Sequence, residues 1–247
     1  MSAPPPLELV LLWHHHQPDY RRAQDRCAML PWVRLHATKD YLDMALRLER
    51  FPGMRCSFNF VPSLLDQIDD AAAGGPDLLF DRLALAVAEL SADDRDELVR
   101  RCASAPRHAF ERWPAYRVLA DRLRRASRPN SHVVVADREL LRLECWFLLA
   151  WLDPMFLGEP EAKAALVTVP DLDVAHRDAL LALHRRLTAR VIGAYRERAE
   201  AGQIELSVSP YYHPILPLLV DLRSARRARP DMPLPHEPLS VPEDAIH

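Results

Sequence analysis

Glycine is scarce in this sequence of 247 residues, which contains 6 glycines and 22 prolines. Proline stiffens turns, whereas glycine-rich segments are typical of flexible linkers. The composition therefore argues against domains joined by a mobile tether. No fixed-period repeat and no long low-complexity tract is found in the sequence. A chain of 247 residues is long enough for one large barrel domain or two small domains.

The sequence also lacks the cysteine spacing of a structural metal site. Its four cysteines, Cys27, Cys56, Cys102 and Cys145, are scattered and form no Cys-x-x-Cys pair, which argues against a zinc knuckle. Free thiols in a reducing compartment are the simpler interpretation. The N-terminus has neither the basic segment nor the longer apolar run of a secretory signal. We therefore expect a cytoplasmic protein.

Strong positive charge and long apolar runs are missing as well. The net charge is -3, so no basic field favours a nucleic-acid partner. No apolar stretch is long enough to cross a bilayer, and we expect no membrane partner. The chain is 49% hydrophobic, which allows a substantial core. The sequence carries no signal for an oligomeric state.

One stretch, LELVLLWHHHQPDY, combines an apolar run with a polar cluster. Residues 7–13 are apolar except at Glu8, and they predict a strand buried on both faces. His14, His15 and His16 follow, and then Gln17-Pro18. Polar groups just past the carboxyl end of such a strand occupy the place where barrel enzymes keep their chemistry. Surface histidines in a loop are the plainer alternative.

Two further strands are indicated. Residues 55–61, RCSFNFV, alternate in polarity and predict a second strand, with Asn59 at a pocket rim. A helix with Thr38 as its N-cap precedes this strand, and another begins at Pro62-Ser63. Residues 203–208, QIELSV, predict a third strand on which Glu205 shares a polar face with Gln203 and Ser207.

Residues 64–200 are mostly helical in pattern, including one long helix over residues 173–201 that Gly202 ends. Strand, helix, strand, helix is typical of a parallel α/β sheet. We therefore expect one α/β segment spanning residues 1–247, in which a large helical block separates the second and third strands. After the third strand, SPYYHP repeats the design of the first: an apolar strand, then aromatic residues, histidine and proline.

Three stretches together resemble glycoside hydrolase family 57, the retaining α-glucan-active enzymes. WHHHQPDY with LPWVRLHATKDYLDM resembles the family's first motif, LECWFLLAWLDP a helical segment of its amylase-like members, and GQIELSVSPYYHPILPLL its second motif. The resemblance implies that this chain is the N-terminal portion of a (β/α)7 barrel, about three strands of it, with a large helical insertion between the second and third strands. The expected partner is an α-glucan or maltooligosaccharide. The substrate-binding candidates are His14, His16, Gln17, Glu205, His213, Tyr211 and Trp32.

The resemblance also implies what this segment leaves out. The family's nucleophile is a glutamate on the fourth strand and its acid/base is a later aspartate, and both are expected beyond His247. Retaining cleavage needs two carboxyl groups about 5 Å apart, and Glu205 is the one convincing carboxylate here; Asp19 is a weaker candidate and more typical of a loop cap. We therefore expect no catalytic residue, no cofactor and no activity in this chain alone, and an α-1,4 or α-1,6 glucan hydrolase or transferase in the full-length form.

Two alternatives remain. His14, His16 and His213, with Glu205, could coordinate zinc in a metal-dependent deacetylase-like or mannosidase-like barrel, although such sites usually include aspartates and no matching pair is present. The chain could also be a non-catalytic relative that binds glucan or a partner protein.

Overall fold

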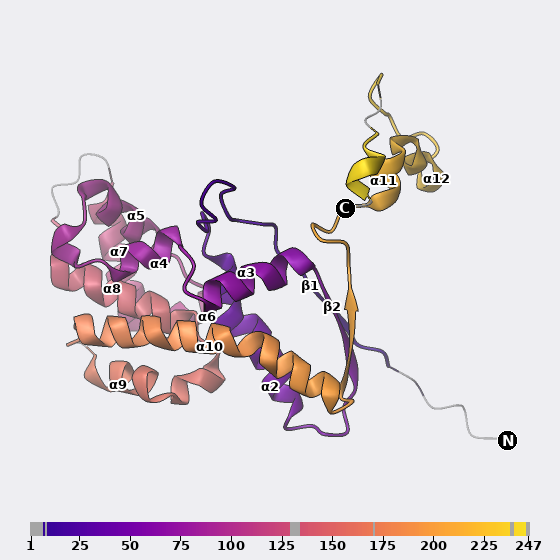
Figure 1. Ribbon diagram of the computed structural model, residues 1–247. Coiled ribbons are helices and arrows are strands. Elements are labelled where there is room, and N and C mark those ends of the chain that lie inside the picture. The colour runs from indigo at the N-terminus through magenta and orange to yellow at the C-terminus, as the bar shows by residue number, and fades with distance from the viewer. Residues whose placement is uncertain (1–6, 8, 129–133, 170, 238–239, 246–247) are drawn as a thin grey trace.

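The computed structural model describes residues 7, 9–128, 134–169, 171–237 and 240–245. It is a mixed α/β structure whose strands are β1 (Leu12–His15), β2 (Cys56–Phe60) and β3 (Ile204–Val208). They form a parallel sheet in the order β1-β2-β3, with a large group of helices to one side (Figure 1). The predicted second and third strands and the parallel sheet are confirmed.

The first strand differs from its prediction in position and in burial. It begins at Leu12 rather than at residue 7, and it includes His14 and His15. The apolar residues before it are exposed, with Leu7 at 95% and Val10 at 81% of their surface accessible, so the predicted burial on both faces is wrong. The physical reason is the strand's place at the edge of the sheet. Within the described residues β1 pairs only with β2, and its apolar flank has little to pack against.

Helices cover one face of the sheet. They are α2 (Leu42–Leu48), α3 (Pro62–Ala72) and the long α10 (Val174–Glu200). Phe58 and Phe60 of β2 point to this side, and their rings lie 5.0 and 4.8 Å from the ring of Tyr195 in α10. Asp173 caps α10 by accepting from the His176 N–H, and Gly202, at φ 64°, ends it. The predicted long helix is confirmed.

The segment between β1 and β2 is helical from Trp32 onward. It consists of α1 (Trp32–His36), a π-helical turn over Ala37–Tyr41, and α2. Thr38 therefore lies inside the helix, and the prediction that it is an N-cap is wrong. Its hydroxyl is fully buried and donates to the carbonyl of Trp151, 2.8 Å away. Thr38 thus ties the π turn to the helical block, a role that its local sequence does not reveal.

A block of helices separates β2 from β3, as predicted. Its core is a continuous cluster of buried apolar side chains, much of it supplied by α8 (Asp137–Ala150). Ser91 caps α5 (Ala92–Cys102), since its hydroxyl accepts from the Asp94 N–H. Besides α3 and α10, the elements are α4 (Leu78–Ala84), α5 (Ala92–Cys102), α6 (Arg107–Arg112), α7 (Pro114–Ala126), α8 (Asp137–Ala150) and α9 (Pro160–Thr168).

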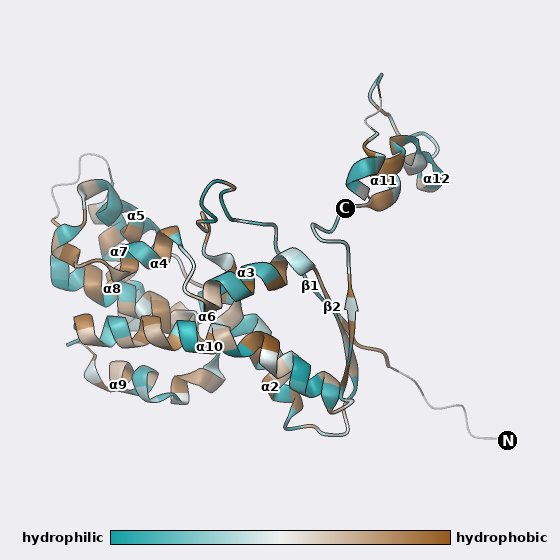
Figure 2. Ribbon diagram, viewed as in Figure 1, coloured by the Kyte–Doolittle hydropathy of each residue, from teal (hydrophilic) through white to brown (hydrophobic). Residues whose placement is uncertain are grey.

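After β3 the chain forms a separate group of short helices. These are α11 (Leu216–Val220), the 3-10 turns Leu222–Ser224 and Pro242–Ala245, and α12 (Ala225–Ala228). They pack on one another and stand apart from the helical block (Figure 1). α10 alternates hydrophobic and hydrophilic turns along its length, and α11 is largely hydrophobic (Figure 2). Among the described helices, none has the length and apolar character needed to cross a membrane.

Gln203 secures the start of β3 and yields a first prediction. Its side chain is 5% exposed, and its Nε2 donates to the carbonyls of Leu48, at 2.7 Å, and Phe51, at 3.1 Å. We expect Gln203→Ala to lower the free energy of unfolding by about 1–2 kcal/mol, because it leaves the buried Leu48 carbonyl without this donor. Urea denaturation measures the change. Gln24→Ala, at an exposed loop position, is the control; equal losses in both variants would contradict the assignment.

Candidate functional site

The three strands present a largely polar face on the side opposite the helices, with Leu12 of β1 as an exposed apolar member in register with Ser57. The parallel register aligns Ser57 with Glu205, and it aligns His14 with Asn59 and Ser207. Residues paired across parallel strands point to the same face, so these five side chains form two rows. Ser57 Oγ donates to Glu205 Oε2 at 3.3 Å, and Asn59 Nδ2 donates to Ser207 Oγ at 3.0 Å. The face is open to solvent, with Glu205, Ser207 and His14 all exposed.

Asn59 connects all three strands in the row of His14, Asn59 and Ser207, which we call the upper row. Its Oδ1 accepts from Ser209 Oγ at 2.8 Å and lies 2.7 Å from Nδ1 of His14. With this orientation of the amide, the acceptor Oδ1 requires a proton on Nδ1 of His14. Nε2 of His14, to which no described residue bonds, is then the ring nitrogen that can bond to a ligand hydroxyl. Asn59, which the sequence places at a pocket rim, holds together the row that contains His14 and Ser207.

Three histidines gather at the carboxyl ends of β1 and β3. The ring centroid of His213 lies 4.6 Å from that of His14 and 5.0 Å from that of His16, and the His14 and His16 rings are 5.9 Å apart. We call these residues the histidine cluster. Burial, with smaller contributions from His213 and His14, lowers the pKa of His16. His16 is therefore neutral at pH 7 and able to hydrogen-bond as donor and acceptor.

The remaining histidine of the run points the other way. His15 is 6% exposed and lies on the helix-covered face, with its Nε2 3.2 Å from the Tyr195 hydroxyl. Burial, and then the neighbouring His14, lowers the pKa of His15 to about 4. Three successive histidines thus have different environments, because side chains alternate across a strand. His15 belongs to the core.

Gln17 is held by tyrosines rather than free. Its Nε2 donates to the Tyr41 hydroxyl at 3.1 Å, and its Oε1 accepts from the Tyr20 hydroxyl at 2.7 Å. The π-helical turn places Tyr41 at this contact. Asp19 accepts from the Arg21 N–H at 3.0 Å and pairs with the Arg21 side chain. The interpretation of Asp19 as a loop cap is confirmed.

Glu205 lies in the other row, with Ser57, which we call the lower row. It lies two residues before Ser207 along β3, a rise of about 6.6 Å, so it is on the face of the histidine cluster but one row away. Its predicted companion Gln203 is not on this face, since Gln203 precedes β3 and its amide is buried against Leu48. Alternation fails there because the strand begins only at Ile204.

The two aromatic candidates for substrate binding, Tyr211 and Trp32, lie in different places. Tyr211 and Tyr212 follow β3 and pack edge to face with ring centroids 4.6 Å apart, exposed by 40% and 65%. Trp32 lies at the start of α1, and its ring centroid is 5.9 Å from that of Trp151, the residue that follows α8. Trp32 and Trp151 line a hollow with residues of α5, which none of the three clustered histidines lines.

Sequence reasoning missed several residues that shape this region. Ser57 and Ser209 complete the polar face on which Ser207 was predicted, and Asp66 of α3 accepts a hydrogen bond from the Tyr211 hydroxyl. The period-two pattern of RCSFNFV could have identified Ser57. Within the described ranges, no group of three or more histidine, cysteine, aspartate or glutamate side chains is arranged to hold a metal ion.

Comparison with known proteins gives one match. The family model described as glycosyl hydrolase family 57 matches residues 10–232, a range that contains all three strands and the histidine cluster. No curated protein and no solved structure matches the chain.

Proposed function

Because the chain belongs to glycosyl hydrolase family 57, we propose that its polar sheet face binds the sugar chain of a retaining α-glucan hydrolase or transferase. The observation that supports this best is the convergence of His14, His16 and His213 beside a row of amide, hydroxyl and carboxylate groups. Sugar hydroxyls both donate and accept hydrogen bonds, and imidazole nitrogens can take either role. Glu205 adds a carboxylate acceptor on the same face.

The sheet supports a barrel that continues beyond these strands. Among the described residues, β1 and β3 each pair only with β2, so each has a free edge. Leu206 and Val208 of β3 are 46% and 68% exposed on the side that helices cover elsewhere. Further strand-helix units on these edges would bury them and close the sheet into the (β/α)7 barrel of the proposal. The helical block between β2 and β3 is, in this proposal, an insertion in that barrel.

Retaining cleavage needs a nucleophile and an acid/base about 5 Å apart. The polar face supplies Glu205, which we assign to substrate binding and to stabilising positive charge on the sugar. We place the glutamate nucleophile and the aspartate acid/base outside residues 1–247. The cysteines are buried and free, in keeping with the reducing cytoplasm that we propose as the location.

Isothermal titration with maltoheptaose tests the proposal. We expect the chain to bind maltoheptaose without cleaving it, because the face offers groups that recognise sugar hydroxyls but not the two catalytic carboxyl groups. Cellohexaose, which has β linkages, serves as the comparison and is expected to bind more weakly. Equal binding of both, or binding of neither, would contradict an α-glucan site.

The proximity of three imidazoles favours one other candidate, a metal-dependent barrel of the deacetylase or mannosidase kind. Histidine nitrogens are common zinc ligands. We expect maltoheptaose affinity to be unchanged after treatment with EDTA, since our assignment uses the imidazoles as hydrogen-bonding groups. Elemental analysis of the purified protein measures the same point directly: zinc at one ion per chain would replace our proposal with this alternative.

A further inference from the structure

The loops after β1 and β3, which carry His16 and His213 of the histidine cluster, are both attached to α3. In the loop after β1, the Tyr20 N–H donates to Gln67 Oε1 at 2.9 Å, and Gln67 Nε2 donates to the Pro18 carbonyl at 3.0 Å. In the loop after β3, the Tyr211 carbonyl accepts from the Ser63 N–H at 3.1 Å. One helix therefore holds both loops, although they are far apart in the sequence.

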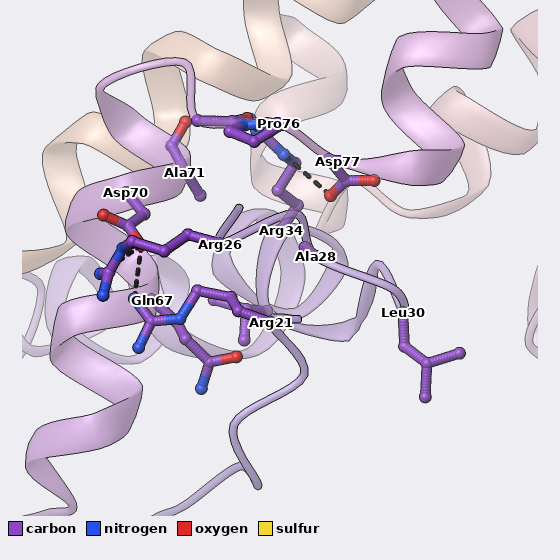
Figure 3. A pocket seen from close by; sticks show the side chains of 12 residues that line it. Arg21, Arg26, Ala28, Leu30, Arg34, Gln67, Asp70, Ala71, Pro76 and Asp77 are labelled. Atoms are coloured by element: carbon purple, nitrogen blue, oxygen red, sulfur yellow. Dashed lines mark hydrogen bonds and ion pairs between the residues drawn. The ribbon is translucent and has the colours of Figure 1, made fainter. Parts of the chain in front are cut away.

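Asp66 is the side chain at which these attachments meet. Its Oδ2 accepts from the Tyr211 hydroxyl at 2.7 Å and from Arg21 Nη2 at 2.8 Å. The Arg21 side chain is 5% exposed and also pairs with Asp19 and with Asp70. Figure 3 shows the guanidinium groups of Arg21 and Arg26 directed at Asp70, one helical turn beyond Asp66 on α3. The first loop is thus fixed to α3 by partly buried ion pairs, and the second by a charge-assisted hydrogen bond.

His213 needs such support because its backbone is in an unfavourable conformation. It has a φ of 55°, in the left-handed region, which costs a residue with a side chain about 1 kcal/mol or more. Its N–H donates to the Pro210 carbonyl at 2.8 Å, closing a tight turn around Tyr211 and Tyr212. Fixing Tyr211 therefore fixes this turn and the direction of the His213 ring.

We propose that Asp66 is a positioning residue, which acts through Tyr211 to hold His213 against His14 and His16. The role of the cluster in binding glucan rests on the function proposed above, whereas the geometric link does not. A single carboxylate oxygen joins Arg21 of the first loop to Tyr211 of the second. Loss of either contact lets the His213 turn move relative to β1, and the cluster then opens although its three histidines are unchanged.

Adjacent tyrosines provide a matched test of the link through Tyr211. Tyr211→Phe removes the hydroxyl that bonds to Asp66 and leaves the ring. Tyr212→Phe removes a neighbouring hydroxyl that makes no hydrogen bond to any described residue. Imidazole ring signals in NMR spectra, recorded without sugar, report the surroundings of each histidine. We expect Tyr211→Phe to shift the ring signals of His213 and His16 and Tyr212→Phe to leave them in place; no shift in Tyr211→Phe, or equal shifts in both, would overturn the proposal.

Two aspartates on α3 provide the second pair of variants. Asp66→Ala removes the shared carboxylate, whereas Asp69→Ala removes an exposed carboxylate of the same helix. We expect Asp66→Ala to reproduce the ring shifts and to weaken maltoheptaose binding roughly tenfold, the effect of losing a hydrogen bond to a charged group. Asp69→Ala keeps both properties. Unchanged ring signals in Asp66→Ala overturn the inference; if wild-type protein fails to bind maltoheptaose while the signals shift, the proposed function fails and the positioning role stands.

Discussion

Glu205→Gln is expected to reduce glucan turnover about 100-fold in an enzyme that carries this chain together with a nucleophile and an acid/base. The transition state of glycoside cleavage carries positive charge on the sugar. A carboxylate on the substrate-binding face stabilises that charge, and an amide of the same shape does not. The loss should therefore fall on kcat and kcat/KM for maltoheptaose.

The same substitution should leave the fold intact. Glu205 is exposed, and within the described structure its side chain has one hydrogen bond, from Ser57 Oγ at 3.3 Å. Exposed substitutions of this kind change stability by about 0.5 kcal/mol or less. Thermal denaturation checks this, with the exposed Glu200→Gln at the end of α10 as the control for both measurements. A variant that unfolds, or one that turns over glucan at the wild-type rate, would show that Glu205 is structural or irrelevant to the reaction.

Glu144→Gln is expected to stabilise the chain at pH 8, by an amount approaching 3 kcal/mol. Glu144 lies in α8 with no accessible surface, and neither carboxyl oxygen has a hydrogen-bond partner among the described residues. Its nearest cation is Arg177, whose Nη1 is 3.6 Å from Oε2. Burial, opposed in part by Arg177, raises the pKa of Glu144 from 4.5 to about 7. The folded state therefore favours the protonated form, which glutamine imitates.

The direction of the pH effect follows from that raised pKa. The stabilisation from protonated Glu144 is fully present below pH 4.5 and is lost as the pH rises through 7. Urea denaturation at pH 5, 6, 7 and 8 should thus show wild-type protein losing stability relative to Glu144→Gln as the pH increases. Burial lowers the pKa values of His15 and His184 to about 4. These two residues therefore have the opposite pH dependence: they reduce the stability of the fold as the pH falls below 6.5. Wild-type protein and Glu144→Gln both contain these histidines, so the difference between their free energies of unfolding reports Glu144 alone. Parallel plots of stability against pH for the two proteins would contradict the raised pKa.

Much of this architecture can be predicted from the sequence because hydrophobic period and turn chemistry are local. The alternation of RCSFNFV predicts β2, and the helical pattern that Gly202 ends predicts α10. The parallel arrangement followed from the order of the elements. These features depend on neighbouring residues, and no distant contact overrides them.

The features that sequence reasoning got wrong or missed depend on contacts between residues far apart in the chain. The apolar residues before Leu12 suggested a buried strand, but burial depends on whether another element covers them. Thr38 has the local signs of a cap, yet its hydroxyl serves the carbonyl of Trp151, 113 positions away. Asp66 has the sequence appearance of an ordinary surface acid on an amphipathic helix, and only the fold brings Tyr211 to it.

The central position of β2 has a consequence for the order in which the molecule is made. Ser57 meets Glu205 across 148 positions, so β2 has its second neighbour only after the whole helical block has left the ribosome. Non-local parallel pairing of this kind forms slowly, since the entropy of closing a long loop is lost before the strand contacts stabilise the chain. The nascent chain therefore carries one unpaired side of β2 while the helical block is synthesised, and the polar face of the sheet forms only after β3 has followed that block.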